Sequence, residues 1–153
     1  MGSRQEREYR YSWKRQNWFD NQKAEHMAVR TGVGLFDMTS FGKIEVSGPG
    51  ALPLLERVAD NRIDRGIGSV VYTQFLNDRG GIEADVTVTR LADSRFRVVT
   101  GGAHGMADHK WLSDHLPRNG SAQLADLTSA WSTIGLWGPR ARDVLASTTS
   151  DDV

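Results

Sequence analysis

A single aspartate inside an otherwise β-branched segment is the first candidate for chemistry in this sequence. Apolar and polar side chains alternate over residues 82–89, with Ile82, Ala84, Val86 and Val88 expected on one face. Asp85 is expected on the other, polar face, beside Thr87 and Thr89. Aspartate is unfavourable in a strand, so Asp85 is either exposed to solvent or retained for a role. In the second case its carboxylate can accept a hydrogen bond from a ring nitrogen and take or guide a proton.

Asp85 belongs to a predicted β-hairpin over residues 70–91. In its first arm, Tyr72, Gln74 and Leu76 are expected on one face and Thr73, Phe75 and Asn77 on the other. Residues 77–81 supply the turn, because glycine reaches positive φ without a Cβ clash. On this evidence alone Tyr72 can equally be an ordinary half-buried strand residue.

Residues 98–105 read as a strand, a glycine loop and the start of a helix. A loop of this kind can hold a phosphate at the helix N-terminus, so a nucleotide-binding role stays open. The glycine spacing is not that of a dinucleotide-binding fingerprint, and a plain helix entry is the alternative.

The hairpin also carries a family resemblance. Residues 72–85 follow the pattern Tyr-x4-Asn-x2-Gly-Gly-Ile-x2-Asp, which resembles the folate-site hairpin of the glycine cleavage T-protein (aminomethyltransferase) family. Residues 35–49 resemble the early strand of that family, and residues 135–141 resemble its later Gly-Pro helix start. Residues 18–37 resemble more narrowly the T-protein-like domain that follows the flavin domain in dimethylglycine and sarcosine dehydrogenases and oxidases. The resemblance covers roughly residues 13–145.

This resemblance implies roles for individual residues. Asp85 matches the aspartate that contacts the folate nitrogen which attacks the one-carbon unit, so it is the expected catalytic residue. Phe41 stands where the family commonly has methionine near the pterin, and either side chain makes an apolar wall. The expected cofactor-binding residues are Tyr72, Phe41, Thr87, Thr89, Thr100 and Gly101.

The function implied by the resemblance is tetrahydrofolate-dependent transfer of an aminomethyl or methylene unit from a methylated amine or a glycine derivative. Tetrahydrofolate is the expected cofactor, and FAD is expected only in a separate domain of a longer parent. The expected partners are folate, a small methylated amine or amino acid, and either a second copy of the chain or a flavin domain. The alternative is a non-catalytic regulatory or partner-binding module that keeps the folate-binding fold.

Composition narrows the range of partners. The chain has 19 Lys and Arg against 19 Asp and Glu, so no net field draws it to nucleic acid or to an anionic membrane. No apolar run is long enough for a transmembrane helix. The absence of cysteine excludes disulfides and thiolate chemistry, and the four histidines lack the spacing of a helical metal clamp, so no metal site is expected. This composition suits a cytoplasmic protein.

The order of predicted elements indicates an α+β fold on a mostly antiparallel sheet, the N-terminal portion of the aminomethyltransferase folate-binding fold. Residues 1–19 are interpreted as a lead-in segment that docks by its aromatic side chains, and residues 20–153 as the N-terminal part of the folate-binding domain. Helices are expected over residues 23–30, 50–60, 103–115 and from 140. Strands are expected over residues 35–47, 70–91, 95–100, 122–128 and 131–137.

A few individual placements follow from these elements. Asp20 is a plausible N-cap of the first helix. Met106, Trp111 and Leu112 are expected to face inward from the helix over residues 103–115. Trp131 and Trp137 alternate with apolar residues and are expected in the core.

Overall fold

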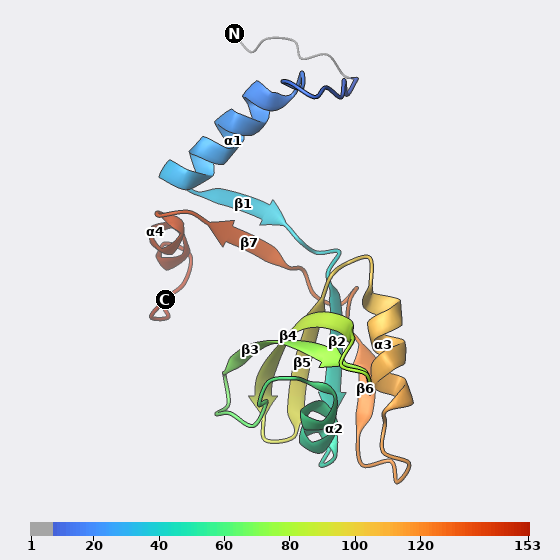
Figure 1. Ribbon diagram of the computed structural model, residues 1–153. Helices are drawn as coiled ribbons and strands as arrows, with labels where there is room; N and C mark the ends of the chain where they lie inside the picture. Colours follow the sequence, from blue (N-terminus) through green and yellow to red (C-terminus); the bar gives the residue numbers. More distant parts are fainter. Residues whose placement is uncertain (1–7) are drawn as a thin grey trace. The chain divides into compact units, whose positions relative to one another are not determined.

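The protein is described over residues 8–153 by a computed structural model (Figure 1). Its chain forms two compact units, one of Asp37–Thr133 and one that combines the chain up to Phe36 with Ile134–Val153. Residues 1–7 of the predicted lead-in segment lie outside the described residues. Over the described part of the chain there are four helices and seven strands.

The unit of residues 37–133 is built on a five-stranded sheet with the order β3-β4-β5-β2-β6. All of its strand pairs are antiparallel, and hairpins connect β3 to β4 and β4 to β5. The predicted α+β fold on a mostly antiparallel sheet is confirmed. The elements are β2 (Gly42–Ser47), α2 (Ala51–Val58), β3 (Val70–Leu76), β4 (Ile82–Ala92), β5 (Arg95–Thr100), α3 (Gly105–Asp114) and β6 (Gln123–Asp126).

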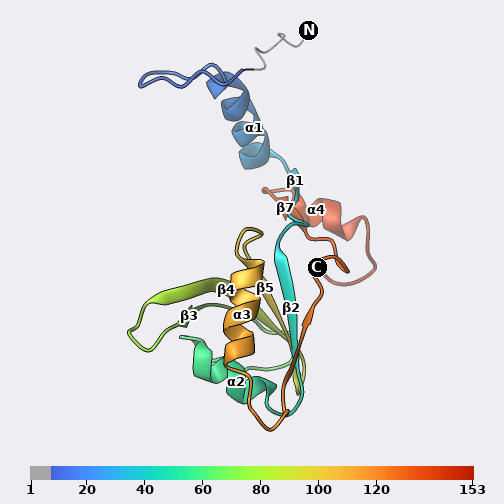
Figure 2. The same ribbon diagram turned by 90° about the vertical axis from the view of Figure 1, so that its right-hand side faces the viewer.

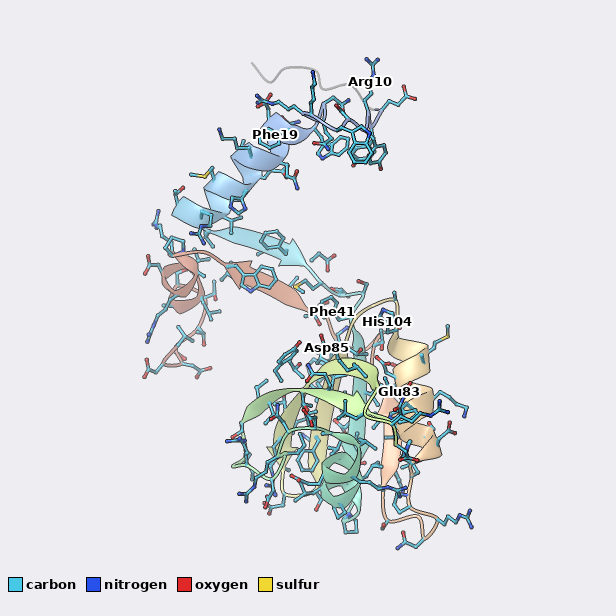
Figure 3. The ribbon with its side chains drawn as sticks, in the orientation of Figure 1. Arg10, Phe19, Phe41, Glu83, Asp85 and His104 are labelled. Carbon is cyan, nitrogen blue, oxygen red and sulfur yellow. The ribbon has the colours of Figure 1, made fainter. Side chains whose placement is uncertain are left out.

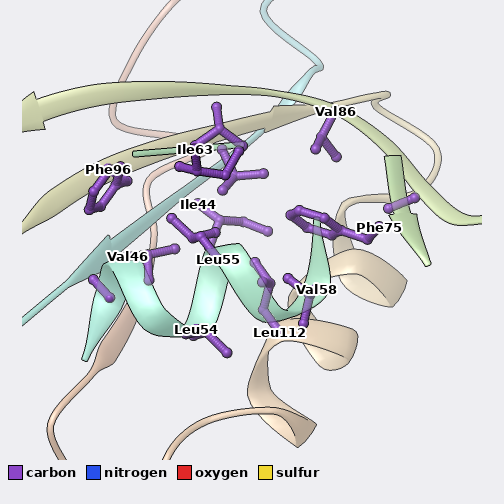
Figure 4. Packing of buried hydrophobic residues seen from close by; sticks show 14 of the residues in the cluster. Ile44, Val46, Leu54, Leu55, Val58, Ile63, Phe75, Val86, Phe96 and Leu112 are labelled. Carbon is purple, nitrogen blue, oxygen red and sulfur yellow. The ribbon is translucent and has the colours of Figure 1, made fainter. Parts of the chain in front are cut away.

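Helices α2 and α3 pack on one face of this sheet (Figure 2). Alternation along the strands directs one set of side chains to that face, and α2 adds a stripe of apolar residues from successive turns. Together these side chains form the core shown in Figure 4. Its members include Ile44, Val46, Leu54, Leu55, Val58, Ile63, Phe75, Val86, Phe96 and Leu112. The opposite face of β3 and β4 is open, and Tyr72 on it is 60% exposed.

The second unit contains α1 (Phe19–Thr31), the paired strands β1 (Gly34–Asp37) and β7 (Ile134–Trp137), and α4 (Ala141–Ala146). The rings of Phe36 and Trp137 lie 5.2 Å apart across the two strands. Neither α1 nor α4 has a fully buried residue. The chain crosses itself closely at Gly138, where φ is 124° and an added Cβ would lie 2.4 Å from the carbonyl oxygen of Gly32.

The segment over residues 35–47 is two strands, because β1 pairs with β7 and β2 lies in the larger sheet. The predicted N-cap is wrong: α1 begins at Phe19, so Asp20 lies within its first turn and pairs there with Arg15. In the lead-in segment Tyr9 and Tyr11 pack edge-on against Trp18, with ring centroids 5.2 and 5.3 Å apart.

Some predicted core residues are exposed. Met106 is 92% exposed in the first turn of α3, although Leu112 on the same helix is buried as predicted and Trp111 is half-buried. Trp131 and Trp137 are each 52% exposed, so their placement in the core was wrong. The guanidinium group of Arg97 instead lies over Trp131, 4.9 Å from the centroid of the ring. A cation–π contact of this kind can form at the protein surface.

Candidate functional site

The turn between β3 and β4 fixes the register of the strand that carries Asp85. The side-chain oxygen of Asn77 accepts hydrogen bonds from the backbone N–H groups of Arg79, at 3.0 Å, and Gly81, at 2.9 Å. Gly80 has φ of 75°, the left-handed conformation that the sequence predicts for this turn. Asn77 and its two glycines are therefore turn residues, as predicted.

A register shift separates the first residues of β4 from the rest of the strand. Phe75 pairs with Ala84 but Leu76 pairs with Ile82, so one extra residue of β4 bulges there. Ile82 is 69% exposed, and its predicted place on the buried face with Ala84, Val86 and Val88 is wrong. From Ala84 onward the predicted alternation holds, and Asp85 lies on the open face.

The carboxylate of Asp85 is held by two side chains from the neighbouring strand. The Tyr72 hydroxyl donates to Oδ2 at 2.9 Å, and the Gln74 amide donates to Oδ1 at 3.2 Å. Gln74 lies directly opposite Asp85 in the strand pairing. Tyr72 lies two residues before Gln74 in β3 and therefore points to the same face. The hydrogen bond to Asp85 raises the pKa of the Tyr72 phenol, because it stabilises the protonated form.

The two predicted threonines of β4 lie at different distances from this carboxylate. Thr87 is directly opposite Tyr72, so it shares the open face next to the Tyr72–Asp85 pair. Thr89 faces the same way but lies four residues along the strand, roughly 13 Å from Asp85 at the rise of a β-strand. It pairs there with Arg97 and Val70. The structure brings Thr87 to the candidate site and leaves Thr89 outside it.

A cavity of about 380 Å³ opens beside Asp85. Strand β5 ends at Thr100, opposite Val86, so residues 82–85 of β4 extend beyond it toward the start of α3. Figure 3 shows Asp85, Glu83 and His104 around this end of the sheet. The lining residues are Ile82, Glu83, Ala84, Asp85, Thr100, Gly101, His104 and Asp108.

Thr100 and Gly101, two of the predicted cofactor-binding residues, therefore line the same cavity as Asp85. Thr100 is buried, and its hydroxyl donates to Oδ2 of Asp108, which is only 2% exposed. The Asp108 N–H in turn donates to the His104 carbonyl at 3.0 Å, which makes the glycine loop an ordinary helix entry. The Thr100 hydroxyl thus holds α3 against the sheet, while the Asp85 carboxylate is held from β3.

Phe41 lies at the same end of the sheet but does not line the cavity. It is half-buried, and its N–H donates to the Met38 carbonyl at 3.0 Å, which closes a turn just before β2. The next residue, Gly42, pairs with Thr100 and approaches it so closely that an added Cβ would lie 2.8 Å from the threonine methyl group. Figure 3 shows Phe41, Asp85 and His104 at this end of the unit.

Sequence reasoning missed the supporting residues of the site. A role for Gln74 could have been predicted, because it lies two residues after Tyr72 in the strand and therefore shares its face. The burial of Asp108 depends on the contact between α3 and Thr100, which no local pattern encodes.

A larger cavity of about 420 Å³ lies between the start of α2 and residues 115–121, and none of the predicted site residues lines it.

Two further findings concern membrane-spanning helices and metal sites. None of the helices in residues 8–153 has the length and apolar character required to cross a bilayer. In the same part of the chain no group of three or more histidine, aspartate or glutamate side chains is arranged to hold a metal ion.

The antiparallel sheet with its packed helices is the fold of an aminomethyltransferase-type module. Residues 3–153 match the family model of the GCVT N-terminal domain, and the chain belongs to this family. The crystal structure of glycine cleavage system aminomethyltransferase T from Bartonella henselae superposes with a TM-score of 0.74 at 33% identity, over 81% of this chain and 34% of that one.

Curated relatives place similar segments within much longer proteins. The 4-methylaminobutanoate oxidase (formaldehyde-forming) of Paenarthrobacter nicotinovorans is 44% identical over 94% of this chain, which spans 17% of that relative. Mitochondrial dimethylglycine dehydrogenase of Mus musculus is 31% identical over 97% of this chain, again spanning 17% of the relative. The mitochondrial pyruvate dehydrogenase phosphatase regulatory subunit of Mus musculus is 33% identical over 85% of this chain, or 15% of its own length.

Proposed function

We propose that this chain carries the part of an aminomethyltransferase-type site that binds tetrahydrofolate, with Asp85 as its catalytic residue. The observation that supports the proposal most is the exposed Asp85 carboxylate, which Tyr72 and Gln74 hold in a fixed orientation beside a cavity. The family match and the hairpin resemblance agree with this assignment.

The residues present suit a folate. An ionised carboxylate offers about four acceptor positions, and each oxygen of Asp85 has one protein donor, so each can still accept a hydrogen bond from a ligand. Tyr72 supplies an exposed ring beside the carboxylate, and Phe41 supplies an apolar side chain at the same end of the sheet. Thr87, Thr100 and Gly101 complete the set of cofactor-binding residues that we propose near Asp85, while Thr89 is too distant to share a contact with it.

Tetrahydrofolate, when bound, supplies the ring nitrogen that receives the one-carbon unit. Asp85 would accept the hydrogen bond from that nitrogen and take up its proton, as a positioned general base does. Tyr72 and Gln74 hold the Asp85 carboxylate in one orientation, so the side chain is already ordered when the ligand binds. The physical work of these residues is to orient a nucleophile rather than to form a covalent bond.

The donor in this proposal is a methylated amine or a glycine derivative, and the names of two relatives motivate it. The chain spans about a sixth of those relatives, so an amine-oxidising flavin site is proposed for a separate domain of a longer parent. Under this proposal residues 20–153 form the N-terminal part of the folate-binding domain, and its partner is a flavin domain or a second copy of the chain.

The second candidate function is a regulatory module that has kept the fold without turnover. The similarity to a phosphatase regulatory subunit is the observation that favours it. A nucleotide-binding role for residues 100–105 is disfavoured by charge. The cavity at that loop is lined by the carboxylates of Glu83, Asp85 and Asp108 and by no lysine or arginine, which opposes a phosphate group.

Calorimetry separates folate binding from nucleotide binding. We expect (6S)-tetrahydrofolate to bind the chain with one site and ATP not to bind. Asp93→Asn is the matched control for Asp85→Asn, because Asp93 is an exposed aspartate beyond the far end of the same strand. Absence of tetrahydrofolate binding to the wild-type chain would contradict the proposed function, and ATP binding in its place would favour the nucleotide role.

A further inference from the structure

Lys43 is a buried lysine that the proposed chemistry does not use. It lies on β2, opposite Val99, and only 2% of it is exposed. Val99 pairs with Thr87 and Thr87 with Tyr72, so Lys43 belongs to the same cross-strand row as two residues of the candidate site. Lysine is almost never fully buried unless its charge is compensated, because desolvation of an ammonium group is costly.

The Lys43 ammonium group donates hydrogen bonds to backbone carbonyl groups alone. Nζ donates to the carbonyl oxygens of Thr39 at 2.9 Å, Phe41 at 2.9 Å and Thr128 at 3.2 Å. An ammonium group has three donors, so all of them are used. Among residues 8–153 no carboxylate lies within ion-pair distance of Nζ. The buried charge therefore serves to hold chain segments rather than to pair with an acid.

The backbone of Lys43 contacts the second of these segments as well. Its N–H donates to the Thr128 hydroxyl at 3.1 Å, and its carbonyl accepts from the Leu127 N–H at 2.8 Å. One residue thus fastens the turn before β2 to the segment after β6. A nearby pair of bonds supports the same junction: the Met38 N–H donates to the Thr133 carbonyl at 2.8 Å, and the Thr133 N–H donates to the Thr39 hydroxyl at 3.3 Å.

We propose that Lys43 is a positioning residue that holds Phe41 in the place where it contacts folate. This inference rests on the proposed function. Two of the three carbonyl groups on Nζ belong to Thr39 and Phe41, so the ammonium group fixes the backbone on both sides of Ser40. A turn held from inside the protein presents the Phe41 ring before the ligand arrives, and such preorganisation lowers the ordering cost of binding.

Lys43→Met tests this role, because methionine fills a similar volume and removes the three donors. Arg90→Met is the matched control. The Arg90 guanidinium also fastens backbone carbonyl groups, those of Arg65 at 2.6 Å and Asp93 at 3.2 Å, but it does so at the far end of β4. Both substitutions take hydrogen-bond donors away from backbone carbonyl groups, and Arg90→Met also removes an ion pair with Asp64, so both are expected to lower the denaturant midpoint of unfolding.

Two measurements distinguish a positioning role from a loss of stability. We expect hydrogen exchange at the Phe41 and Met38 amides to become faster in Lys43→Met and to stay unchanged in Arg90→Met. We expect the Kd for (6S)-tetrahydrofolate, measured by calorimetry on the 153-residue chain, to rise about tenfold or more in Lys43→Met, as loss of a preorganised contact predicts. In Arg90→Met the Kd should match that of the wild type.

Each outcome has a definite meaning. A wild-type chain that binds no tetrahydrofolate overturns the proposed function and this inference with it. A wild-type chain that binds, with Lys43→Met binding equally well, overturns the positioning role alone. If Lys43→Met does not fold, Thr128→Val replaces it, because this change removes the hydroxyl that accepts from the Lys43 N–H and that also bonds the Asp126 carboxylate, while it keeps the Thr128 carbonyl on Nζ. It should weaken folate binding in the same direction, and unchanged binding would overturn the role of the junction.

Discussion

The hydroxyl group of Tyr72 donates a 2.9 Å hydrogen bond to Oδ2 of Asp85 across the β3–β4 pair. The two residues are diagonal neighbours on the open face, since Tyr72 lies opposite Thr87 and Asp85 lies opposite Gln74. The bond ties the aromatic ring and the carboxylate of the candidate site into one unit. It also provides a way to observe the site without any ligand.

The titration of Tyr72 should report on Asp85. In a Tyr9→Phe, Tyr11→Phe background Tyr72 is the remaining tyrosine, and phenolate absorbance follows its ionisation alone. The hydrogen bond to Asp85 raises the Tyr72 pKa, so Asp85→Asn should lower it toward the ordinary value of about 10. Identical titration curves with aspartate and asparagine at position 85 would show that the bond does not form in solution.

The same shift predicts how the bond affects stability as pH changes. The Tyr72 pKa is raised on folding, so the bond favours the folded state fully below the unfolded pKa of about 10. Its contribution is lost as pH rises through the folded-state pKa. Unfolding measured in denaturant at a series of alkaline pH values should therefore show a steeper loss of stability in the wild type than in Tyr72→Phe, and parallel curves would contradict the prediction.

Asp85→Asn should lower one-carbon transfer far more than folate affinity. The amide keeps the shape of the side chain and can still hydrogen-bond, but it cannot take a proton. The expected loss in kcat is about 10²–10⁴-fold, the usual contribution of a general base, with a change in Kd of about tenfold or less. Steady-state kinetics of one-carbon transfer, with Asp93→Asn as control, provide the measurement. Equal turnover in Asp85→Asn and the wild type would leave Asp85 a positioning or surface residue.

Core packing of the larger unit can be tested with two isoleucines from one loop. Ile63 is 2% exposed and Ile67 is 62% exposed, although only three residues lie between them. Ile63→Ala should lower the free energy of unfolding by about 2–5 kcal/mol because it leaves a cavity in the core. Ile67→Ala should change it by less than about 0.5 kcal/mol. Similar urea midpoints for the two variants would contradict the packing described here.

The chain should self-associate through the exposed rings of Phe36 on β1 and Trp137 on β7. The two ring centroids lie 5.2 Å apart, and the two residues are 39% and 52% exposed. Contiguous apolar patches on monomers tend to find partners. Light scattering over a dilution series should detect association that Trp137→Ser reduces. Met106→Ser removes an isolated exposed side chain on α3 and should not affect it. A monomer at every concentration would overturn the prediction.

Much of the fold could be predicted from local patterns. Alternation located the β3–β4 hairpin and separated Thr73 and Phe75, which are buried, from Tyr72 on the open face. Glycine and asparagine located its turn, and the strand over residues 95–100 was placed with its observed bounds. Each of these features is decided by neighbours in sequence, which explains why the sequence alone was sufficient.

The misplaced residues have causes that no local pattern contains. Ile82 is exposed because of a bulge at Phe75 and Leu76, and the pairing that produces it involves both strands. Trp131 lies outside any strand, and its half-exposed ring contacts Arg97 of β5, a residue distant in sequence. No local pattern predicts that Lys43 is buried. Its charge is stabilised by the carbonyl group of Phe41, just before it, and by that of Thr128, which is 85 residues away in sequence.

Backbone NMR of the labelled chain during titration with (6S)-tetrahydrofolate shows directly whether folate binds against Asp85. The largest amide shift changes should fall on residues 72–74, 83–87 and 100–104 and on Phe41, and Asp85→Asn should reduce them. Shift changes confined to the larger cavity near Arg57 and His115, or no changes at saturating ligand, would contradict this prediction.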